Sequence, residues 1–550
     1  ELECGEASGD APAHTAACSE EPQVRLLARE PEGPQCCGSS RAGILGAIGA
    51  QRELLRNGDL SQREESGGGS SRDQPLDDGE VAEGSQQVGL PDDRTLREHL
   101  RRGPTWAAAA NNIAFMVVPR AIPSCLAATG WPIGLAALAY SSVVTYDTGL
   151  LIGKVCNLYP DAASFPEITA EALACWRTRR GDSERLVARW RTSARRATLG
   201  LQFLTYYLSA VAELIYFEQY CGQLFQTSPL CQWHWLLIVS AASLPVLQVP
   251  TFSESRWVAF CLGILPLFLN IGVFVYEILL VSPWNCTPGP LYDPPVFGDV
   301  FIGLSALAYA FGGHGLYPEE IREMKEPSKW PRVMHWTYGV ALPLYWACGI
   351  LGYVAYGNYS QANINLNFPP NMANTLSLGV QLVQELYFVL SSNLVMMLFL
   401  ELSLRLDPSK HCQPRWHGLP PALGRFFVRA LFFASQVFIA QLLLAGEGDT
   451  LLSLQSLIGA VGMTAFTYFL PYVLWVCLAP ERISVARYAW CVLNIVVGVG
   501  VMVLGLVSSI QDLAESSSGV FGGACRIPYA YAPLSPSDPC YESGLPRAAT

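Results

Sequence analysis

The chain has 550 residues, of which 51% are hydrophobic and 15% are charged, and its formal net charge is −11. A soluble protein of this length would be richer in charged residues, and an acidic chain lacks the basic surface that nucleic-acid binding needs. The composition therefore favours a membrane protein and disfavours a nucleic-acid partner.

Residues 1–95 differ in composition from the rest of the chain. They are rich in Gly, Ser and acidic residues, as in SQREESGGGSSRDQPLDDGEVAEGSQQ (61–87). Such a segment cannot bury enough apolar area to fold, so we predict a disordered cytosolic tail that could bind a cytosolic partner. Its cysteines, like the loop His411–His417, lack a full set of metal ligands. No metal site is therefore expected.

Apolar runs of roughly 20 residues, the length that crosses a bilayer, follow the tail. We identify eleven, at about 105–127, 132–156, 197–223, 234–250, 256–281, 298–323, 333–356, 373–403, 424–445, 449–478 and 484–510. Apolar and polar residues do not alternate with period two in these runs, which favours helices over strands. We therefore predict an all-α membrane protein with eleven transmembrane helices in residues 96–510. Residues 511–550 then form a C-terminal tail outside the cytosol.

Basic residues are distributed unevenly among the predicted loops. Arg residues gather between runs two and three, and further Lys and Arg follow runs four, six, eight and ten. The loops on the other side contain no Lys or Arg, and they are 128–131, 224–233, 282–297, 357–372 and 446–448. Because cytosolic loops collect Lys and Arg, we predict a cytosolic N-terminus.

The predicted outer loops carry two kinds of candidate modification. Asn285 and Asn358 begin Asn-x-Ser/Thr sequons, which are glycosylation candidates on this side of a membrane. Cys231 and Cys286 lie in adjacent outer loops, where an oxidising compartment permits a disulfide. The sequence leaves open whether they pair or stay free thiols.

The sixth run is interrupted by the sequence Gly312-Gly313-His314-Gly315. Each Gly inside a helix costs roughly 1 kcal/mol relative to Ala, and broken backbone survives at membrane depth only where it lines a cavity or is buried in protein. The freed helix ends can hold a carboxylate or a cation. Close helix packing through small residues is the alternative, but a His within the cluster favours a functional break.

The first run is interrupted as well, by Asn111, Asn112, Pro119 and Arg120. Runs one and six are five apart, so they are corresponding members of two five-helix repeats, and a substrate is expected between them. The candidate substrate-binding residues are Asn111, Asn112, Ala114, Phe115, Ala310, Phe311, Gly312, Gly313, His314 and Gly315.

Coupling to an ion is expected from polar residues inside the runs. His314 can titrate near neutral pH. Arg120 and Glu213 form either a charge pair that replaces a bound Na⁺ or a structural ion pair. The hydroxyls of Ser391 and Ser392 either face a cation or bond to a carbonyl one turn back. His314, Arg120 and Glu213 favour H⁺ over Na⁺, and no cofactor is expected.

Three stretches resemble the amino acid/auxin permease family. They are the segment from Tyr309 to Asn358, LLSLQSLIGAVGMTAFTYFLPYVLWV (451–476) and VVPRAIPSCLAATGWPIGL (117–135). The resemblance covers about 104–510. It implies the LeuT-like fold, a 5+5 inverted repeat plus one extra helix. It also implies secondary transport of amino acids or a related carboxylate, driven by protons or Na⁺.

One departure from the family pattern leaves a second reading open. The first break usually carries Gly-x-Gly, whereas this chain has Asn112-Ile113-Ala114, and Arg120 follows Pro119. We predict a proton-coupled amino acid symporter, with a non-transporting amino acid sensor as the alternative. No enzyme motif is present, so an enzyme is not expected. The plasma membrane and a vacuolar or lysosomal membrane both fit the predicted topology.

Overall fold

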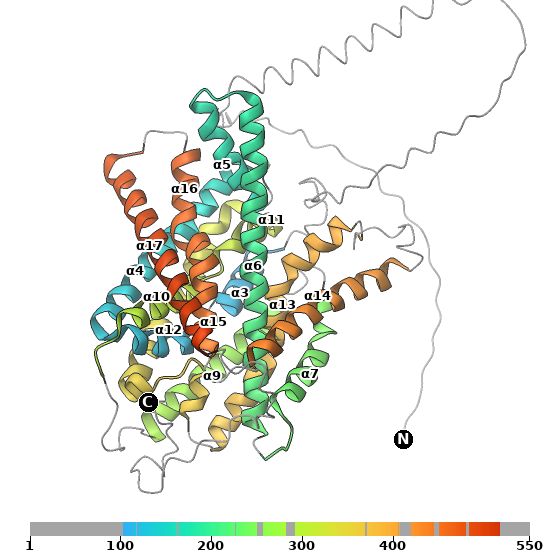
Figure 1. The fold of residues 1–550 in the computed structure, drawn as a ribbon, viewed down its shortest axis with the longest axis vertical. Coiled ribbons are helices and arrows are strands. Elements are labelled where there is room, and N and C mark those ends of the chain that lie inside the picture. Colours follow the sequence, from blue (N-terminus) through green and yellow to red (C-terminus); the bar gives the residue numbers. More distant parts are fainter. Residues whose placement is uncertain are drawn as a thin grey trace, which may run out of the picture. The chain divides into compact units, whose positions relative to one another are not determined.

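The computed structural model describes residues 103–516 except 117, 161, 163, 226, 250–256, 282–291, 369–370, 405, 407–419, 445–449 and 480–482. The predicted tails 1–95 and 511–550 therefore lie outside the described residues, apart from the end of the last helix. Within the described part, the named elements are all helices (Figure 1).

The first predicted span is broken next to Pro119 and Arg120, as the sequence suggested, but Asn111 and Asn112 lie within a helix and do not interrupt it. It consists of α3 (Thr105–Met116), η1 (Pro119–Ala121) and the start of α4 (Ile122–Leu158). Gly130 interrupts α4 with φ 69°, a left-handed conformation that Gly adopts without steric cost, and Pro132 follows it. The remainder of α4 therefore corresponds to the second predicted span.

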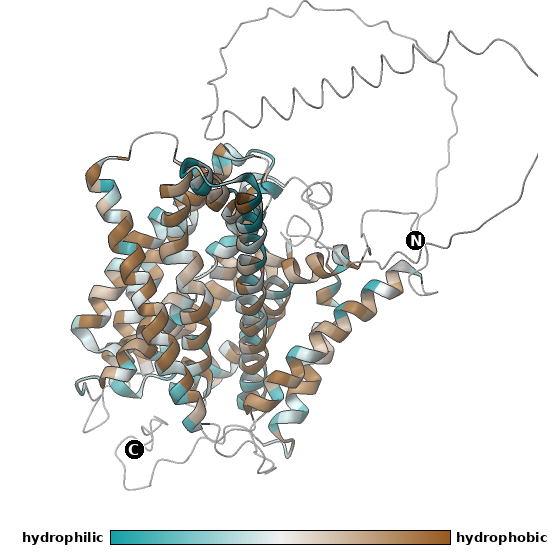
Figure 2. Cartoon of the chain, turned by 45° about the horizontal axis from the view of Figure 1, so that its top comes forward, coloured by the Kyte–Doolittle hydropathy of each residue, from teal (hydrophilic) through white to brown (hydrophobic). Residues whose placement is uncertain are grey.

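A helical hairpin precedes the third span. It is formed by α5 (Phe165–Arg179) and the first part of α6 (Glu184–Leu224). The first turns of α6 carry exposed Arg185, Arg189 and Arg196, and Figure 2 shows hydrophilic colour at this end of the long helix. Along its C-terminal half α6 is buried and packs along α13 (Met372–Ser403).

The next elements include a second interrupted span. They are α7 (Gln232–Ser243), η2 (Val246–Gln248), η3 (Ala259–Ile264), α9 (Leu265–Tyr276), η4 (Glu277–Val281), α10 (Phe297–Ala310), η6 (His314–Leu316) and α11 (Tyr317–Glu323). The break between α10 and η6 contains Gly313, whose φ of 126° is one that an L side chain rarely adopts. The predicted interruption of the sixth run is therefore present in the structure.

The remaining helices complete the bundle. They are η7 (Pro327–Lys329), α12 (Trp330–Tyr356), η8 (Gly357–Tyr359), η9 (Ile364–Asn367), α13, α14 (Pro421–Leu444), α15 (Thr450–Ile458), η10 (Gly459–Met463), η11 (Ala465–Phe469), α16 (Leu470–Leu478) and α17 (Val485–Ser516).

Nine helical stretches of the described chain are long and apolar enough to cross a membrane. The stretch Thr105–Leu158 is one of them, although it covers two predicted spans. The 12-residue α7 lies in the predicted span 234–250 and is too short to be counted. The count of eleven spans and the 5+5 repeat therefore stay predictions.

Large apolar side chains cover the outer faces of several helices. Leu280 is 72% exposed, Leu431 76% and Val496 65%. Exposed apolar surface on this scale is unfavourable in water but suits a lipid environment. Together with the long apolar helices, it identifies an integral, multi-pass membrane protein.

Lipid is as apolar as a protein core, so helices in a bilayer associate through close packing and polar contacts rather than through water exclusion. Two glycines provide such close packing at η10. A Cβ on Gly459 would lie 1.8 Å from the Ser305 carbonyl oxygen, and one on Gly462 would lie 1.6 Å from Thr205 Oγ1. These contacts bring the tenth predicted span against α10 and α6.

Candidate functional site

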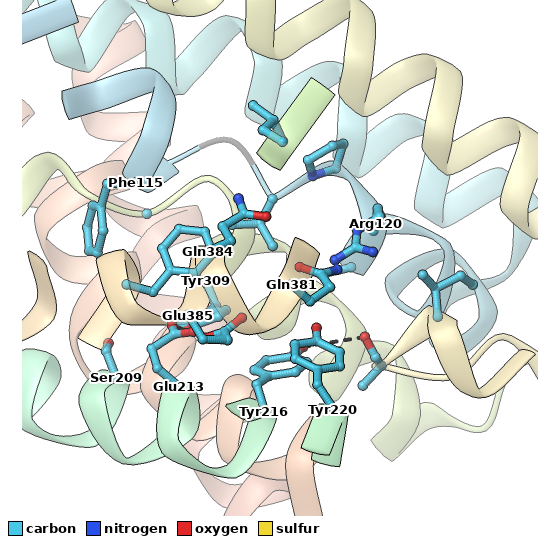
Figure 3. Close-up of a pocket in the computed structure, with 18 of the residues that line it drawn as sticks. Phe115, Arg120, Ser209, Glu213, Tyr216, Tyr220, Tyr309, Gln381, Gln384 and Glu385 are labelled. Carbon is cyan, nitrogen blue, oxygen red and sulfur yellow. Dashed lines mark hydrogen bonds between the residues drawn. The ribbon is translucent and has the colours of Figure 1, made fainter. Parts of the chain in front are cut away.

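A cavity of about 60 Å³ lies where the two broken spans meet (Figure 3). Its walls come from the end of α3, η1, α6, α9, α10 with the break that follows it, the segment from Ala362 into η9, α13 and η10. It is lined by Phe115, Val118, Pro119, Arg120, Ala121, Ser209, Glu213, Tyr216, Tyr220, Leu267, Tyr309, Gly312, Ala362, Ile364, Gln381, Gln384, Glu385, Phe388 and Met463.

One tyrosine stabilises both breaks beside this cavity. The Tyr345 hydroxyl donates to the Ala310 carbonyl at 2.7 Å and accepts from the Val118 N–H at 3.4 Å. Backbone groups released by a helix break need such partners at membrane depth. Tyr345 of α12 therefore links the break in the first predicted span to the break in the sixth.

The sixth-span break approaches the cavity at Gly312. A Cβ on this residue would lie 2.6 Å from Met463 Sδ and 2.9 Å from the Tyr309 carbonyl oxygen. A larger residue would have to displace the backbone or Met463. Glycine at this position therefore lets the break form the cavity wall.

Two carboxyl groups from different helices meet in the cavity. Glu213 of α6 and Glu385 of α13 both line the cavity and lie next to each other in Figure 3, and the Tyr309 hydroxyl donates to Glu213 Oε1 at 2.8 Å. Glu213 is 9% exposed and Glu385 is 2% exposed. The site thus contains a buried acidic pair.

A basic side chain lies on the opposite side of the cavity. Figure 3 shows Arg120 apart from Glu213 and Glu385. Arg120 Nη1 donates to Asn365 Oδ1 at 3.0 Å. Among the described residues no salt bridge joins Arg120 to Glu213, so the ion pair considered from the sequence is absent from this conformation.

The acceptor of Arg120 belongs to a chain of polar contacts. Asn365 Nδ2 donates to Ser377 Oγ at 3.0 Å, Ser377 Oγ donates to Asn270 Oδ1 at 3.0 Å, and Asn270 Nδ2 donates to Gln384 Oε1 at 3.2 Å. This series of hydrogen bonds begins at Arg120 and ends at Gln384, and both residues line the cavity. It fixes η9, α9 and α13 around the site.

The predicted substrate residues of the first span are divided by the structure. Phe115 lines the cavity. Asn111 accepts from the Tyr387 hydroxyl through its carbonyl at 3.3 Å, and Asn112 Nδ2 donates to Glu320 Oε2 at 2.7 Å. Ala114 is fully buried, and a Cβ on Gly263 would lie 2.4 Å from its methyl group. Only Phe115 of these four is brought to the cavity.

The predicted residues of the sixth span are divided in the same way. Gly312 lines the cavity, whereas Ala310, Phe311, Gly313, His314 and Gly315 do not. His314 is fully buried, and its Nε2 lies 2.8 Å from the Thr145 carbonyl oxygen. The Gly313 carbonyl accepts from Tyr206 at 3.4 Å and the Gly315 carbonyl from Gln202 at 2.7 Å.

The predicted coupling residues also separate into two groups. Arg120 and Glu213 line the cavity, but His314, Ser391 and Ser392 do not. The Ser391 hydroxyl donates to the Tyr387 carbonyl at 2.7 Å, the contact one turn back that the sequence left open. Ser392 Oγ is buried with no hydrogen-bond partner in the described part of the chain.

Several cavity residues were not predicted, although a sequence signal existed for them. Gln381, Gln384, Glu385 and Phe388 recur at i, i+3, i+4 and i+7, and together they form one face of α13. Ser209, Tyr216 and Tyr220 share one face of α6 with the predicted Glu213, at i, i+4, i+7 and i+11. A search for polar residues at helical spacing inside apolar runs would have found both faces.

The remaining predicted sites lie away from the cavity. Cys231 is disulfide-bonded, but Cys286 lies outside the described residues, so the Cys231–Cys286 pairing stays a prediction. Asn285 also lies outside them, and Asn358 is partly buried in η8. Both glycosylation sites stay predictions. No group of three or more potential metal ligands gathers in the part of the chain that the structure describes.

Comparison with known proteins places the chain among transporters. The family model described as "Transmembrane amino acid transporter protein" matches residues 105–511. The Arabidopsis thaliana amino acid transporter AVT1E is 20% identical over 416 residues, which is 73% of this chain and 70% of AVT1E. AVT1C of the same plant is 25% identical over 217 residues, which is 39% of this chain and 36% of AVT1C.

A solved structure is similar as well. The manganese transporter of Eremococcus coleocola has a TM-score of 0.42 and 13% sequence identity, covering 81% of this chain and 96% of that one. The family and the relatives are transporters rather than enzymes. Since the family model matches most of its length, the chain belongs to the transmembrane amino acid transporter family.

Proposed function

We propose that this protein moves amino acids across its membrane by proton-coupled symport, with the amino acid held between the broken first and sixth helices. The family supports transport of amino acids. The cavity between the two breaks supports the position of the substrate, since Phe115 and Arg120 from one break and Gly312 from the other line it.

The acidic pair is the observation that carries proton coupling. Two carboxylates in contact repel each other, and a proton held between them removes the repulsion. Glu213 and Glu385 have this arrangement in a membrane-embedded cavity, with Tyr309 as a further hydrogen-bond partner. We propose that one proton binds here together with the amino acid.

His314 is a weaker candidate for the proton site than the acidic pair. Its Nε2 faces the Thr145 carbonyl, which accepts only. Its Nδ1 is buried and has no hydrogen-bond partner among the described residues. A proton added at Nδ1 would therefore lack an acceptor, whereas the carboxyl pair supplies one.

The amino acid sensor remains the second candidate function. Asn112-Ile113-Ala114 stand where the family pattern has glycines, they lie in α3 before the first-span break, and the Asn112–Glu320 hydrogen bond fixes α3 to α11. A site whose two halves are locked in this way could bind without carrying. This reading predicts ligand binding without flux, and a tail that contacts a cytosolic partner.

The orientation and the location of the protein are part of the proposal. We propose a cytosolic N-terminus from the basic residues that precede the first span and that line the loops on the same side. The plasma membrane and a vacuolar or lysosomal membrane both fit this topology.

Uptake of a labelled amino acid mixture into proteoliposomes with an imposed pH gradient tests the proposal. We expect gradient-driven accumulation in the wild type and a loss of about tenfold or more, equivalent to ~1.4 kcal/mol, in Glu213→Gln and in Glu385→Gln. Exchange without a gradient should persist in both variants, because Gln retains the shape and polarity of Glu. Glu184→Gln, at an exposed position of the hairpin, is the matched control.

Two outcomes would contradict the proposal. Uptake that follows a Na⁺ gradient and ignores pH would exclude proton coupling. An absence of uptake, combined with thermal stabilisation of the protein by one amino acid, would favour the sensor.

A further inference from the structure

The cavity carries opposite charges at its two sides. Arg120 of η1 lies at one side, and the Glu213–Glu385 pair of α6 and α13 lies at the other (Figure 3). An amino acid at neutral pH is a zwitterion with the same separation of charge. The arrangement defines an orientation, with the substrate carboxylate toward Arg120 and its ammonium group toward the acidic pair.

Arg120 has unused hydrogen-bonding capacity. A guanidinium offers five N–H donors in a planar fork that matches a carboxylate. Among the described residues, Asn365 Oδ1 is the one acceptor that Arg120 reaches, and it takes a single N–H. The other donors are left for a ligand in the cavity that Arg120 lines.

The first-span backbone at Asn112 and Ala114 does not offer N–H groups to a carboxylate in this cavity. Asn112 and Ala114 do not line the cavity, because Asn112 bonds to Glu320 and Ala114 packs against Gly263. Their N–H groups are therefore not presented to a ligand there. Arg120 is the one basic residue that lines the cavity within the described chain.

The charges of the site balance only for a neutral substrate. Arg120 contributes one positive charge, and the acidic pair with one proton contributes one negative charge. A zwitterion adds no net charge, whereas a Lys-like or Glu-like side chain would add one. An uncompensated charge in a buried site is costly, so charged side chains are disfavoured.

The cavity is also small. Its volume of about 60 Å³ corresponds to a few water molecules. Phe115, Tyr309, Phe388 and Met463 are among its walls, and Met463 lies against Gly312. These bulky walls favour a small side chain on the substrate.

We propose that Arg120 binds the carboxylate of the substrate, and that the site selects amino acids with a small, uncharged side chain such as alanine. This inference rests on the proposed function, because it takes the cavity to be the amino acid site. Arg120 thereby performs the carboxylate recognition that the altered first-span backbone does not offer.

Binding to the purified full chain, measured by isothermal titration calorimetry in detergent, tests the inference. The probes are alanine, its carboxylate-free analogue 2-aminopropan-1-ol, glutamate, lysine and phenylalanine. For the wild type we expect alanine to bind at least about tenfold more tightly than each of the other probes. A tenfold difference in affinity corresponds to ~1.4 kcal/mol of binding free energy.

The variants separate recognition from folding. Arg120→Gln should weaken alanine binding by about tenfold or more and remove the preference for alanine over 2-aminopropan-1-ol. A merely structural role for Arg120 would leave that preference intact. Arg120→Lys keeps the charge without the fork and should retain part of the preference. Arg189→Gln, at an exposed position on the hairpin, is the matched control and should behave as the wild type.

The outcomes distinguish this inference from the proposed function. If Arg120→Gln binds alanine with the full wild-type preference, the carboxylate is held elsewhere, and the inference fails while transport stands. Equal binding of lysine, glutamate and alanine by the wild type would overturn the charge argument, whether or not the variants fold. If the wild type binds no amino acid and transports none, the proposed function fails first.

Discussion

At the scale of single residues, the site depends on hydrogen bonds between buried polar groups. Tyr309 donates to Glu213, and Tyr345 satisfies the backbone of both breaks. Removing one partner of a buried hydrogen bond leaves the other unsatisfied, which costs more than the bond itself contributes. Residues beside the cavity are therefore sensitive to substitution even where they do not touch a substrate.

The Asn112–Glu320 contact is one such pair, with a distance of 2.7 Å between Nδ2 and Oε2. We expect Asn112→Ala to lower the free energy of unfolding by about 1–3 kcal/mol, because the buried Glu320 carboxyl loses this donor. Thermal unfolding of Asn112→Ala, Glu320→Ala and the double variant in detergent measures the effect. An equal loss for Asn112→Ala in both backgrounds would show that the two side chains do not interact.

At the scale of elements, the helices around the cavity are placed by small residues on their contact faces. Gly459 lets η10 approach α10 so closely that a Cβ would meet a backbone carbonyl rather than a movable side chain. A backbone atom cannot rotate away, so the two helices would have to separate. Since α10 leads into the sixth-span break, its position also determines the shape of the cavity.

Gly459→Ala is therefore expected to destabilise the fold by at least about 1–3 kcal/mol, the cost of overpacking. The yield of monodisperse protein in size-exclusion chromatography and its melting temperature are the measurements. Gly339→Ala in α12 is the control, since a Cβ there has no heavy atom within 4 Å. Should both variants melt at the same temperature, the close approach of η10 to α10 would not limit stability.

At the scale of the whole molecule, charge and apolar surface define how the bundle lies in a membrane. Exposed arginines gather on the hairpin of α5 and α6, whereas the loop residues 292–296 after the fifth predicted span carry no basic residue. Translocation of basic loops is disfavoured, so the two regions are expected on opposite sides of the bilayer.

Labelling with a membrane-impermeant maleimide tests this topology. Ser183→Cys lies in the hairpin, and Asp293→Cys lies in the opposite loop, and both positions are exposed. In intact cells that display the protein at their surface, we expect Asp293→Cys to react above the parent background. Ser183→Cys should react only after permeabilisation. The reverse pattern would invert the proposed orientation.

Local features of the chain identified some of the residues that line the cavity. Gly312, Phe115, Arg120 and Glu213 were identified from the sequence, and all four line the cavity. Glycine clusters and prolines mark helix breaks because they act on the backbone where they stand, whatever surrounds them. The family resemblance, confirmed by the family model over residues 105–511, rests on the same kind of local motif.

The sequence by itself thus determined a helical membrane protein, its two broken spans and its family. Only the tertiary structure decided which side of each break faces the cavity. Packing sets the rotation of each helix about its axis, and this rotation turned His314 and Ala114 into the protein while it brought Glu385 against Glu213. Contacts between residues so far apart in the chain have no local signature, so the acidic pair emerged only from the packed bundle.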